Sequence, residues 1–251
     1  MELAELARYL DDHLRVSEIR DAPAALNGLQ VESRRGRVTQ VAAAVDACAA
    51  TIELAAAAGA DLLLVHHGLF WGGLRPLTGP HYRRVGELLR HDIALYSAHL
   101  PLDCHPAVGN NPVLARQLGV TIRGDFALHE GQAIGVWGEM SLTRDELVHR
   151  VSELLGGAPR VLPFGPERIA RVGIVTGAGA TAIPEAAAAG LDTLVTGEGP
   201  HWTYFDAEER GVNVVLAGHY ATETVGVKAL AAHLEAQFGL PWVFLDHPTG
   251  F

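Results

Sequence analysis

Two adjacent histidines, His66 and His67, follow a short run of aliphatic residues and precede Gly68. A continuous apolar run of this length, ending at a glycine, predicts a buried parallel strand. The carboxyl ends of such strands are where open α/β sheets bind their ligands. Core packing does not require adjacent imidazoles. We therefore interpret the pair as candidate metal ligands, against the alternative of a polar loop at a strand end.

A histidine and a carboxylate with a four-residue spacing follow two further predicted strands. One pair is His99 and Asp103, and the other is His219 and Glu223. Imidazole nitrogen and carboxylate oxygen suit Zn, Fe, Mn, Co or Ni as bound ions. For the second pair, the alternative is a helix N-terminus with an acid in its first turn, which the helix macrodipole favours.

An internal repeat relates these groups of residues. Residues 41–71 align without a gap to residues 172–202, and 13 of the 31 positions are identical, four of them in an alanine run. After a change of length the match continues and brings the two histidine–carboxylate pairs into register. Glu198 takes the place of His67. We expect two similar βαβ halves with the site in a crevice between them.

The pattern favours two metal ions rather than one. Adjacent side chains of an extended strand point to opposite faces, so we expect His66 and His67 to reach different ions. A carboxylate such as Glu223 can bridge two ions about 3.5–4 Å apart, as in two-metal hydrolytic sites. Three nearby residues are surplus to the ligand count and are candidates for general acid or base, or for support of a ligand histidine: His99, Glu198 and His201.

The elements that must position these residues alternate between strands and helices. We expect an α/β protein with two similar βαβ halves related by the internal repeat, and a small α+β insertion between them. The expected boundaries are residues 1–124 for the first half, 125–165 for the insertion and 166–251 for the second half. A capping box, Thr143-Arg-Asp-Glu146, opens the helix predicted in the insertion.

Composition limits the function classes. The chain has 251 residues, 49% hydrophobic and 19% charged, which predicts a globular protein. Its net charge of −10 argues against binding to nucleic acid or to an anionic membrane surface. No apolar run reaches the roughly 18 residues of a membrane span. Acidic residues near the start argue against a signal peptide, so we expect a cytoplasmic protein.

Other motifs have two interpretations. Gly177-Ala-Gly179 follows a predicted strand and is compatible with a phosphate loop, but the short glycine pattern favours a tight turn. Trp71 and Trp202 are equivalent in the repeat, and we interpret them as packing residues, with stacking on a base as the alternative. Cys104 is interpreted as a small filler rather than as a metal ligand.

Six short segments, in this order, resemble one known family. They are Asn27-Gly-Leu-Gln-Val31, His66-His-Gly-Leu-Phe-Trp71, Ser97-Ala-His-Leu-Pro-Leu-Asp103, Gly109-Asn-Asn111, Thr196-Gly-Glu198 and Gly218-His-Tyr-Ala-Thr-Glu223. The chain is similar over essentially its whole length to the Nif-three-like dinuclear-metal family, often named type 2 GTP cyclohydrolase I.

The resemblance implies a two-lobed α/β subunit, a ring-shaped homohexamer and two divalent metal ions between the lobes. It implies five ligands, of which the last bridges the ions: His66, His67, Asp103, His219 and Glu223. It places His99 beside the site. The family often has a second histidine or another variation after Thr-Gly-Glu, where this chain has Gly-Pro-His-Trp, so the resemblance assigns no role to His201.

Two functions fit these observations. The first is a metal-dependent hydrolase that acts on a small molecule, such as a nucleotide or a pterin precursor, in the manner of a GTP cyclohydrolase. The second is a non-catalytic protein that binds or handles metal, or a hexameric scaffold that binds partners. An open face on a five-ligand site favours the first function, and the absence of a clear catalytic base favours the second.

Overall fold

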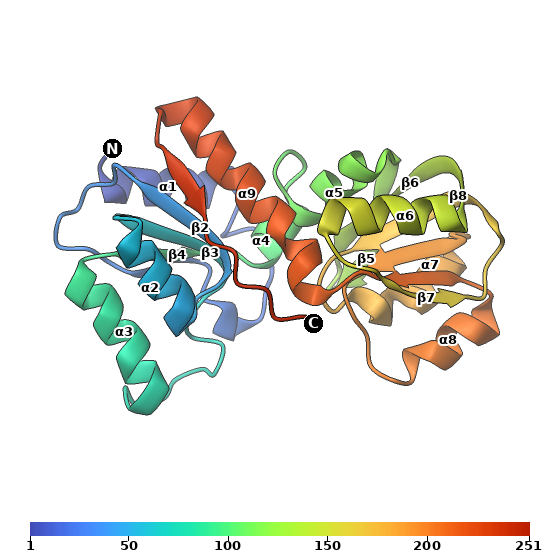
Figure 1. Ribbon diagram of the computed structural model, residues 1–251, viewed down its shortest axis with the longest axis horizontal. Helices are drawn as coiled ribbons and strands as arrows, with labels where there is room; N and C mark the ends of the chain where they lie inside the picture. Colours follow the sequence, from blue (N-terminus) through green and yellow to red (C-terminus); the bar gives the residue numbers. More distant parts are fainter. The chain divides into compact units, whose positions relative to one another are not determined.

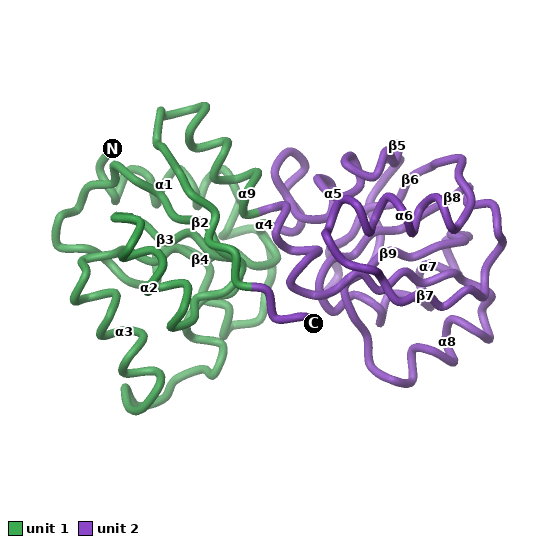
Figure 2. The backbone as a smooth tube through the Cα atoms, in the orientation of Figure 1, with its two compact units in different colours: residues 1–102, 227–247 green, residues 103–226, 248–251 purple.

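The computed structural model describes residues 1–251, which form two compact units (Figure 2). Unit 1 comprises residues 1–102 and 227–247, and unit 2 comprises residues 103–226 and 248–251. Each unit contains one β-sheet with its own helices. Helices α4 (Leu100–Cys104) and α9 (His219–Phe238) both cross a boundary between the units along the chain.

Unit 1 contains a five-stranded mixed sheet with the order β1-β4-β3-β2-β11. Its strands are β1 (Gly28–Val31), β2 (Val41–Asp46), β3 (Leu62–His67), β4 (Ala94–Ser97) and β11 (Trp242–Phe244). Strand β1 is antiparallel to β4, and the other neighbours are parallel. The helices are α1 (Leu3–His13), α2 (Ala49–Ala57) and α3 (Gly79–His91), with a short 3-10 helix at Pro23–Ala25.

The parallel strands of unit 1 are nearly continuous in apolar residues because helices cover both faces of their sheet (Figure 1). Leu63 and Val65 of β3 pack in one core cluster with Ile52 of α2. On the opposite face, Tyr96 of β4 is fully buried, and its hydroxyl donates a hydrogen bond of 2.7 Å to Asp11 of α1. With both faces covered, the carboxyl edge of the sheet is the place where polar side chains can gather.

Unit 2 contains a six-stranded mixed sheet with the order β5-β6-β8-β9-β10-β7. Its strands are β5 (Thr121–His129), β6 (Gln132–Thr143), β7 (Arg160–Pro163), β8 (Arg168–Val175), β9 (Thr193–Thr196) and β10 (Asn213–Leu216). Strands β8, β9 and β10 are parallel, and the other pairs are antiparallel. The helices are α5 (Asn110–Leu118), α6 (Arg144–Leu155), α7 (Ile183–Ala188) and α8 (Thr203–Arg210), with a short 3-10 helix at Gly179–Ala182.

The predicted α/β class is confirmed as two mixed sheets. Residues 125–165, which we expected as an insertion, supply β6, β7, α6 and most of β5, and these strands belong to the same sheet as β8 to β10. The predicted capping box is present: Thr143 Oγ1 accepts from the Glu146 amide, and the Glu146 carboxylate accepts from the Thr143 amide. None of the helices combines the length and the apolar character that a membrane crossing requires.

Candidate metal centre

Three imidazoles of unit 1 lie together at the carboxyl edge of its sheet. His66 and His67 end β3, and His99 follows β4. Their donor nitrogens all lie within 4.8 Å of one another. The centroid of the His66 ring is 4.6 Å from that of His67 and 4.9 Å from that of His99. Three side chains of the predicted site are therefore adjacent, and the donor set is one that divalent transition metals prefer.

The rings of His66 and His67 lie closer together than successive side chains of an extended strand usually do, with centroids 4.6 Å apart. His67 is the last residue of β3 and is paired in register with Asp46 of β2. The side chains of His67 and Asp46 therefore project to the same side of the sheet. The Asp46 carboxylate accepts a hydrogen bond of 2.8 Å from Nδ1 of His67.

Oxygen acceptors fix the tautomers of these rings. Nδ1 of His66 donates to the Ala98 carbonyl at 2.9 Å, as Nδ1 of His67 does to Asp46. A protonated Nδ1 places the lone pair of each neutral ring on Nε2. Metal-binding histidines usually show this arrangement, in which a carboxylate or carbonyl orients the ring and raises its basicity. The geometry of these rings therefore fits metal ligation.

Asp21 holds the third ring, a role that no local sequence pattern indicates. Nδ1 of His99 lies 2.9 and 3.1 Å from the two oxygens of Asp21, which also accept from the Leu100 amide and the Asn27 side chain. The Asn27 carbonyl oxygen accepts from the His99 amide at 2.7 Å. Burial opposes ionisation of Asp21, but the hydrogen bonds from His99, Asn27 and Leu100 lower its pKa below the usual value. The motif that begins at Asn27 thus positions His99.

Trp71 forms one side of this cluster. Its ring meets that of His99 edge to face, with centroids 4.7 Å apart, and lies 5.9 Å from that of His67. It is 37% exposed, so it packs against the imidazoles and also presents a surface to solvent. Trp202, its equivalent in the sequence alignment, is 52% exposed and lies in a different environment in unit 2.

Unit 2 carries a second donor set at the start of α9. His219 and Glu223 are one helical turn apart, with Nε2 of His219 3.2 Å from Oε1 of Glu223. Nδ1 of His219 donates to Glu198 at 2.7 Å. Glu223 is only 3% exposed. Hydrogen bonding to Glu223, partly offset by burial, and the charges of Glu223 and Glu198 raise the pKa of His219 to about 9. The same negative environment favours a divalent cation.

Gly177 leaves room for this carboxylate. Its φ is +64°, and a Cβ at this position would lie 2.2 Å from Oε1 of Glu223. The Gly177 amide donates to Thr222 Oγ1 at 3.0 Å, and its carbonyl accepts from the amides of Gly197 and Glu198. Because its amide is already bonded within the chain, the glycine pattern here forms a tight turn under Glu223 rather than a phosphate loop.

Asp103 is held by the asparagine motif of unit 2. It is buried, and its Oδ1 accepts from Asn110 at 2.8 Å and from the Thr176 hydroxyl at 3.4 Å. The Asn110 side-chain oxygen accepts from the Gly226 amide, and Asn111 accepts from the Thr176 amide, each at 2.7 Å. These bonds tie Asp103 to α9 and to the turn beneath Glu223.

The structure thus gathers most of the predicted residues into local groups. One group is His66, His67 and His99, another is Glu198, His219 and Glu223, and Asp103 lies in the asparagine network of unit 2. His201 is placed elsewhere, edge-on to Phe205 in a separate pocket. Asp21 and Asp46 position His99 and His67, and no pattern in the sequence indicates either role.

We expect Asp46→Asn to weaken metal binding about 10- to 100-fold, the usual effect of removing a carboxylate partner of a ligand histidine. Asp21 holds His99, which is not one of the five expected ligands, so Asp21→Asn should have a smaller effect. The amide keeps the shape but supplies a weaker acceptor to Nδ1 of His67 or His99. Affinities can be measured by competition with a chromophoric chelator. Asp12→Asn, on the exposed face of α1, is the matched control. Equal affinities for all three variants would contradict the positioning role.

Comparisons with known proteins find relatives over the whole length of the chain. A protein of Deinococcus radiodurans named GTP cyclohydrolase 1 type 2 homolog is 48% identical over 248 residues, covering 98% of this chain and 93% of its own. The crystal structure of TTHA1606 from Thermus thermophilus matches with a TM-score of 0.91 and 46% identity, covering 100% of both chains. A structure titled protein ybgI, unknown function, matches with a TM-score of 0.92 and 38% identity over 99% of both chains.

The family model described as Duf34/NIF3 (NGG1p interacting factor 3) matches residues 1–249. This match covers both sheets and every residue of the two donor groups. The motifs that suggested the resemblance lie at the strand ends and helix starts that form these groups. The chain therefore belongs to the Duf34/NIF3 family.

Proposed function

We propose that this protein binds two divalent metal ions and uses them to hydrolyse a small molecule. The proposed ligands are His66, His67, Asp103, His219 and Glu223, with Glu223 bridging the ions. The main support for the proposal is a contact that four imidazoles have in common, those of His66, His67, His99 and His219. In each of them Nδ1 lies 2.7–2.9 Å from an oxygen acceptor, which leaves Nε2 as the nitrogen that binds a metal ion when the ring is neutral.

The chain's own residues orient the donors in this proposal. Asp46, Asp21 and Glu198 hold the rings of His67, His99 and His219 in place through hydrogen bonds with Nδ1. Divalent ions at such donors supply a Lewis acid and lower the pKa of a water molecule, which is the chemistry of hydrolysis. The donor set suits Zn, Fe, Mn, Co or Ni.

A nucleotide is the substrate class that we favour. Two observations support it: relatives covering 98–100% of the chain at 41–48% identity bear the name GTP cyclohydrolase 1 type 2 homolog, and Trp71 presents an aromatic ring beside the imidazoles of unit 1. GTP is therefore the first compound to assay, followed by phosphoesters and cyclic amides.

The test compares activity and metal content in matched variants. Purified protein is loaded with Mn, Fe, Co or Zn and screened with GTP, phosphoesters and amides. We expect His67→Ala to lose metal and activity, whereas His129→Ala, which removes an exposed imidazole from the end of β5, keeps both. Activity that survives His67→Ala would exclude the two-metal mechanism, and a normal metal content in that variant would exclude the site.

A non-catalytic metal-handling role is the second candidate, and one observation favours it. The residues proposed as general acid or base are engaged elsewhere: His99 with Asp21, Glu198 with His219, and His201 with Phe205. In this case the loaded protein would hold its metal through the same five ligands, turn over none of the substrates, and transfer metal to a chelator or to a metal-free acceptor protein.

We also propose a homohexamer and an origin by duplication. The hexamer rests on the family resemblance, and it requires a mass in solution six times the 26.7 kDa of one chain. The duplication is supported by topology: β3 lies between the parallel strands β2 and β4, and β9 lies in the same way between β8 and β10. In this alignment His99 corresponds to His219, and Asp103 to Glu223.

A further inference from the structure

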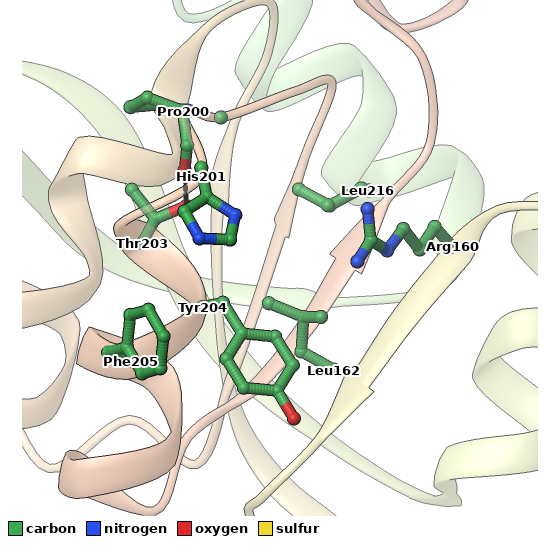
Figure 3. Close-up of a pocket in the computed structure, with 9 residues that line it drawn as sticks. Arg160, Leu162, Pro200, His201, Thr203, Tyr204, Phe205 and Leu216 are labelled. Carbon is green, nitrogen blue, oxygen red and sulfur yellow. Dashed lines mark hydrogen bonds between the residues drawn. The ribbon is translucent and has the colours of Figure 1, made fainter.

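A separate pocket lies at one side of unit 2 (Figure 3). Its volume is about 240 Å³. It is formed by the edge strand β7, the end of β10, the loop after β9 and the start of α8. Its lining includes Arg160, Leu162, His201, Tyr204, Phe205 and Leu216.

The pocket combines an apolar floor with aromatic walls. Leu162 and Leu216 lie between the rings of His201 and Tyr204 on one side and Arg160 on the other (Figure 3). The rings contact each other edge to face: His201 meets Phe205 at 5.7 Å, and Tyr204 meets Phe205 at 5.4 Å. Phe205 is 49% exposed although it is large and apolar. A flat hydrophobic ligand would cover surface that the protein leaves exposed.

Arg160 gives the pocket its charge preference. Its guanidinium lies across the pocket from the His201 imidazole (Figure 3), and it forms no ion pair or hydrogen bond with the rest of the chain. In a chain with a net charge of −10, an arginine without a carboxylate partner is available to an external acid. A guanidinium binds carboxylates and phosphates through paired hydrogen bonds.

The place of the pocket in the chain links it to the candidate metal ligands. Leu216 precedes His219 by three residues, and Gly199 and Pro200 of the pocket follow Glu198 directly. The two segments that bring His219 and Glu198 together therefore also form pocket walls. A ligand seated on Leu216 would lie beside the segment that carries a proposed metal donor.

We propose that this pocket binds a planar aromatic ring with one acidic substituent, a carboxylate or a phosphate. At about 240 Å³ it is smaller than the roughly 300–1,000 Å³ of sites for drug-sized ligands, so it accommodates one ring system rather than a whole nucleotide. The proposal adds a second ligand site and goes beyond the proposed function, in which a nucleotide is the substrate of the metal site. The binding of the ring and its acid does not depend on metal.

The test uses four matched probes on the full-length protein, metal-free and metal-loaded: benzoate, phenyl phosphate, benzamide and cyclohexanecarboxylate. Affinities are measured by ligand-observed NMR titration. We expect benzoate or phenyl phosphate to bind best, and the better of the two identifies the acidic group. Benzamide lacks the charge and cyclohexanecarboxylate lacks the aromatic ring, so each should bind about tenfold more weakly than benzoate.

Variants assign the binding to this pocket. Arg160→Gln and Phe205→Ala should each weaken the binding of the best probe about tenfold, whereas Arg8→Gln, on an exposed face of α1, should leave it unchanged. His219→Ala should lower the metal content and leave probe binding intact, which separates a failure of the metal site from a failure of the pocket. The absence of saturable binding, or equal affinity in Arg160→Gln and Arg8→Gln, would overturn the proposal. The proposal would also be overturned if Phe205→Ala changed the oligomeric mass and the unaltered protein bound no probe. The aromatic patch would then be a subunit interface.

Discussion

Replacing Glu223 with Gln is expected to lower metal affinity at least about a hundredfold, because loss of a partner that only orients a ligand already costs 10- to 100-fold. Glutamine keeps the size of the side chain and one oxygen next to His219 but removes the charge. Glu223 is buried and lies 3.2 Å from Nε2 of His219. A bridging carboxylate also offsets the repulsion between two cations, so both ions should be lost together. Elemental analysis of the purified protein and chelator competition measure this effect.

The matched control for this variant is Glu209→Gln, which removes the same charge from an exposed position on α8. Circular dichroism should show that both variants are folded. If Glu223→Gln kept two ions per chain with unchanged affinity, Glu223 would not be a ligand. If it kept one ion firmly, Glu223 would be a terminal ligand rather than a bridge.

A second readout of the same variant requires no metal. In the metal-free protein, hydrogen bonding to Glu223 is the largest cause of the rise in the pKa of His219 from 6.5 to about 9. Because the folded-state pKa is raised, protonated His219 stabilises the fold below about pH 6.5, and this contribution is lost as the pH rises through about 9. In Glu223→Gln the imidazole pKa, measured by NMR, should fall towards 6.5.

Local sequence patterns predicted where the candidate donor residues lie along their strands and helices. The aliphatic run before His66 forms β3, whose buried position makes both its faces apolar. His99 and His219 each follow the strand predicted to carry them. These signals depend only on residues within a few positions of one another. The chain therefore indicated where each donor lies on its own strand or helix.

The partners of the donors depend on long-range pairing, and they could not be found in this way. Asp46 meets His67 because β2 and β3 pair in register, and Asp21 meets His99 across 78 residues of sequence. A single aspartate at a strand end or in a loop carries no local signal of such a role.

Local sequence patterns also did not predict which strands belong to the sheet of unit 2. The segment 125–165 has the alternation of strands and a helix that fits either a separate insertion or an extension of a neighbouring sheet. Its strands β6 and β7 pair with β8 and β10 at opposite sides of the parallel strands. The choice between the two interpretations depends on these contacts between distant segments, which periodicity does not describe.

Gly177→Ala is expected to weaken metal binding at least about tenfold without altering any ligand. The new methyl group would lie 2.2 Å from Oε1 of Glu223 and 3.3 Å from Nε2 of His219. Both contacts are with side-chain ends, so the protein should still fold, with the carboxylate displaced. The left-handed backbone at φ +64° adds a stability cost of about 1–2 kcal/mol for a residue with a Cβ. Chelator competition and urea unfolding measure the two effects separately.

Gly211→Ala separates the steric effect from the backbone effect. Gly211 has nearly the same conformation, with φ +66°, but the nearest atom to its added Cβ is the Phe164 carbonyl oxygen at 3.7 Å, an ordinary contact. The free energy of unfolding should therefore decrease by a similar amount in both variants. Only Gly177→Ala should also bind metal more weakly. Equal metal affinities in the two variants would show that Glu223 need not occupy its observed position to bind metal. A metal loss in Gly177→Ala alone would show that the turn under Glu223 is part of the metal site.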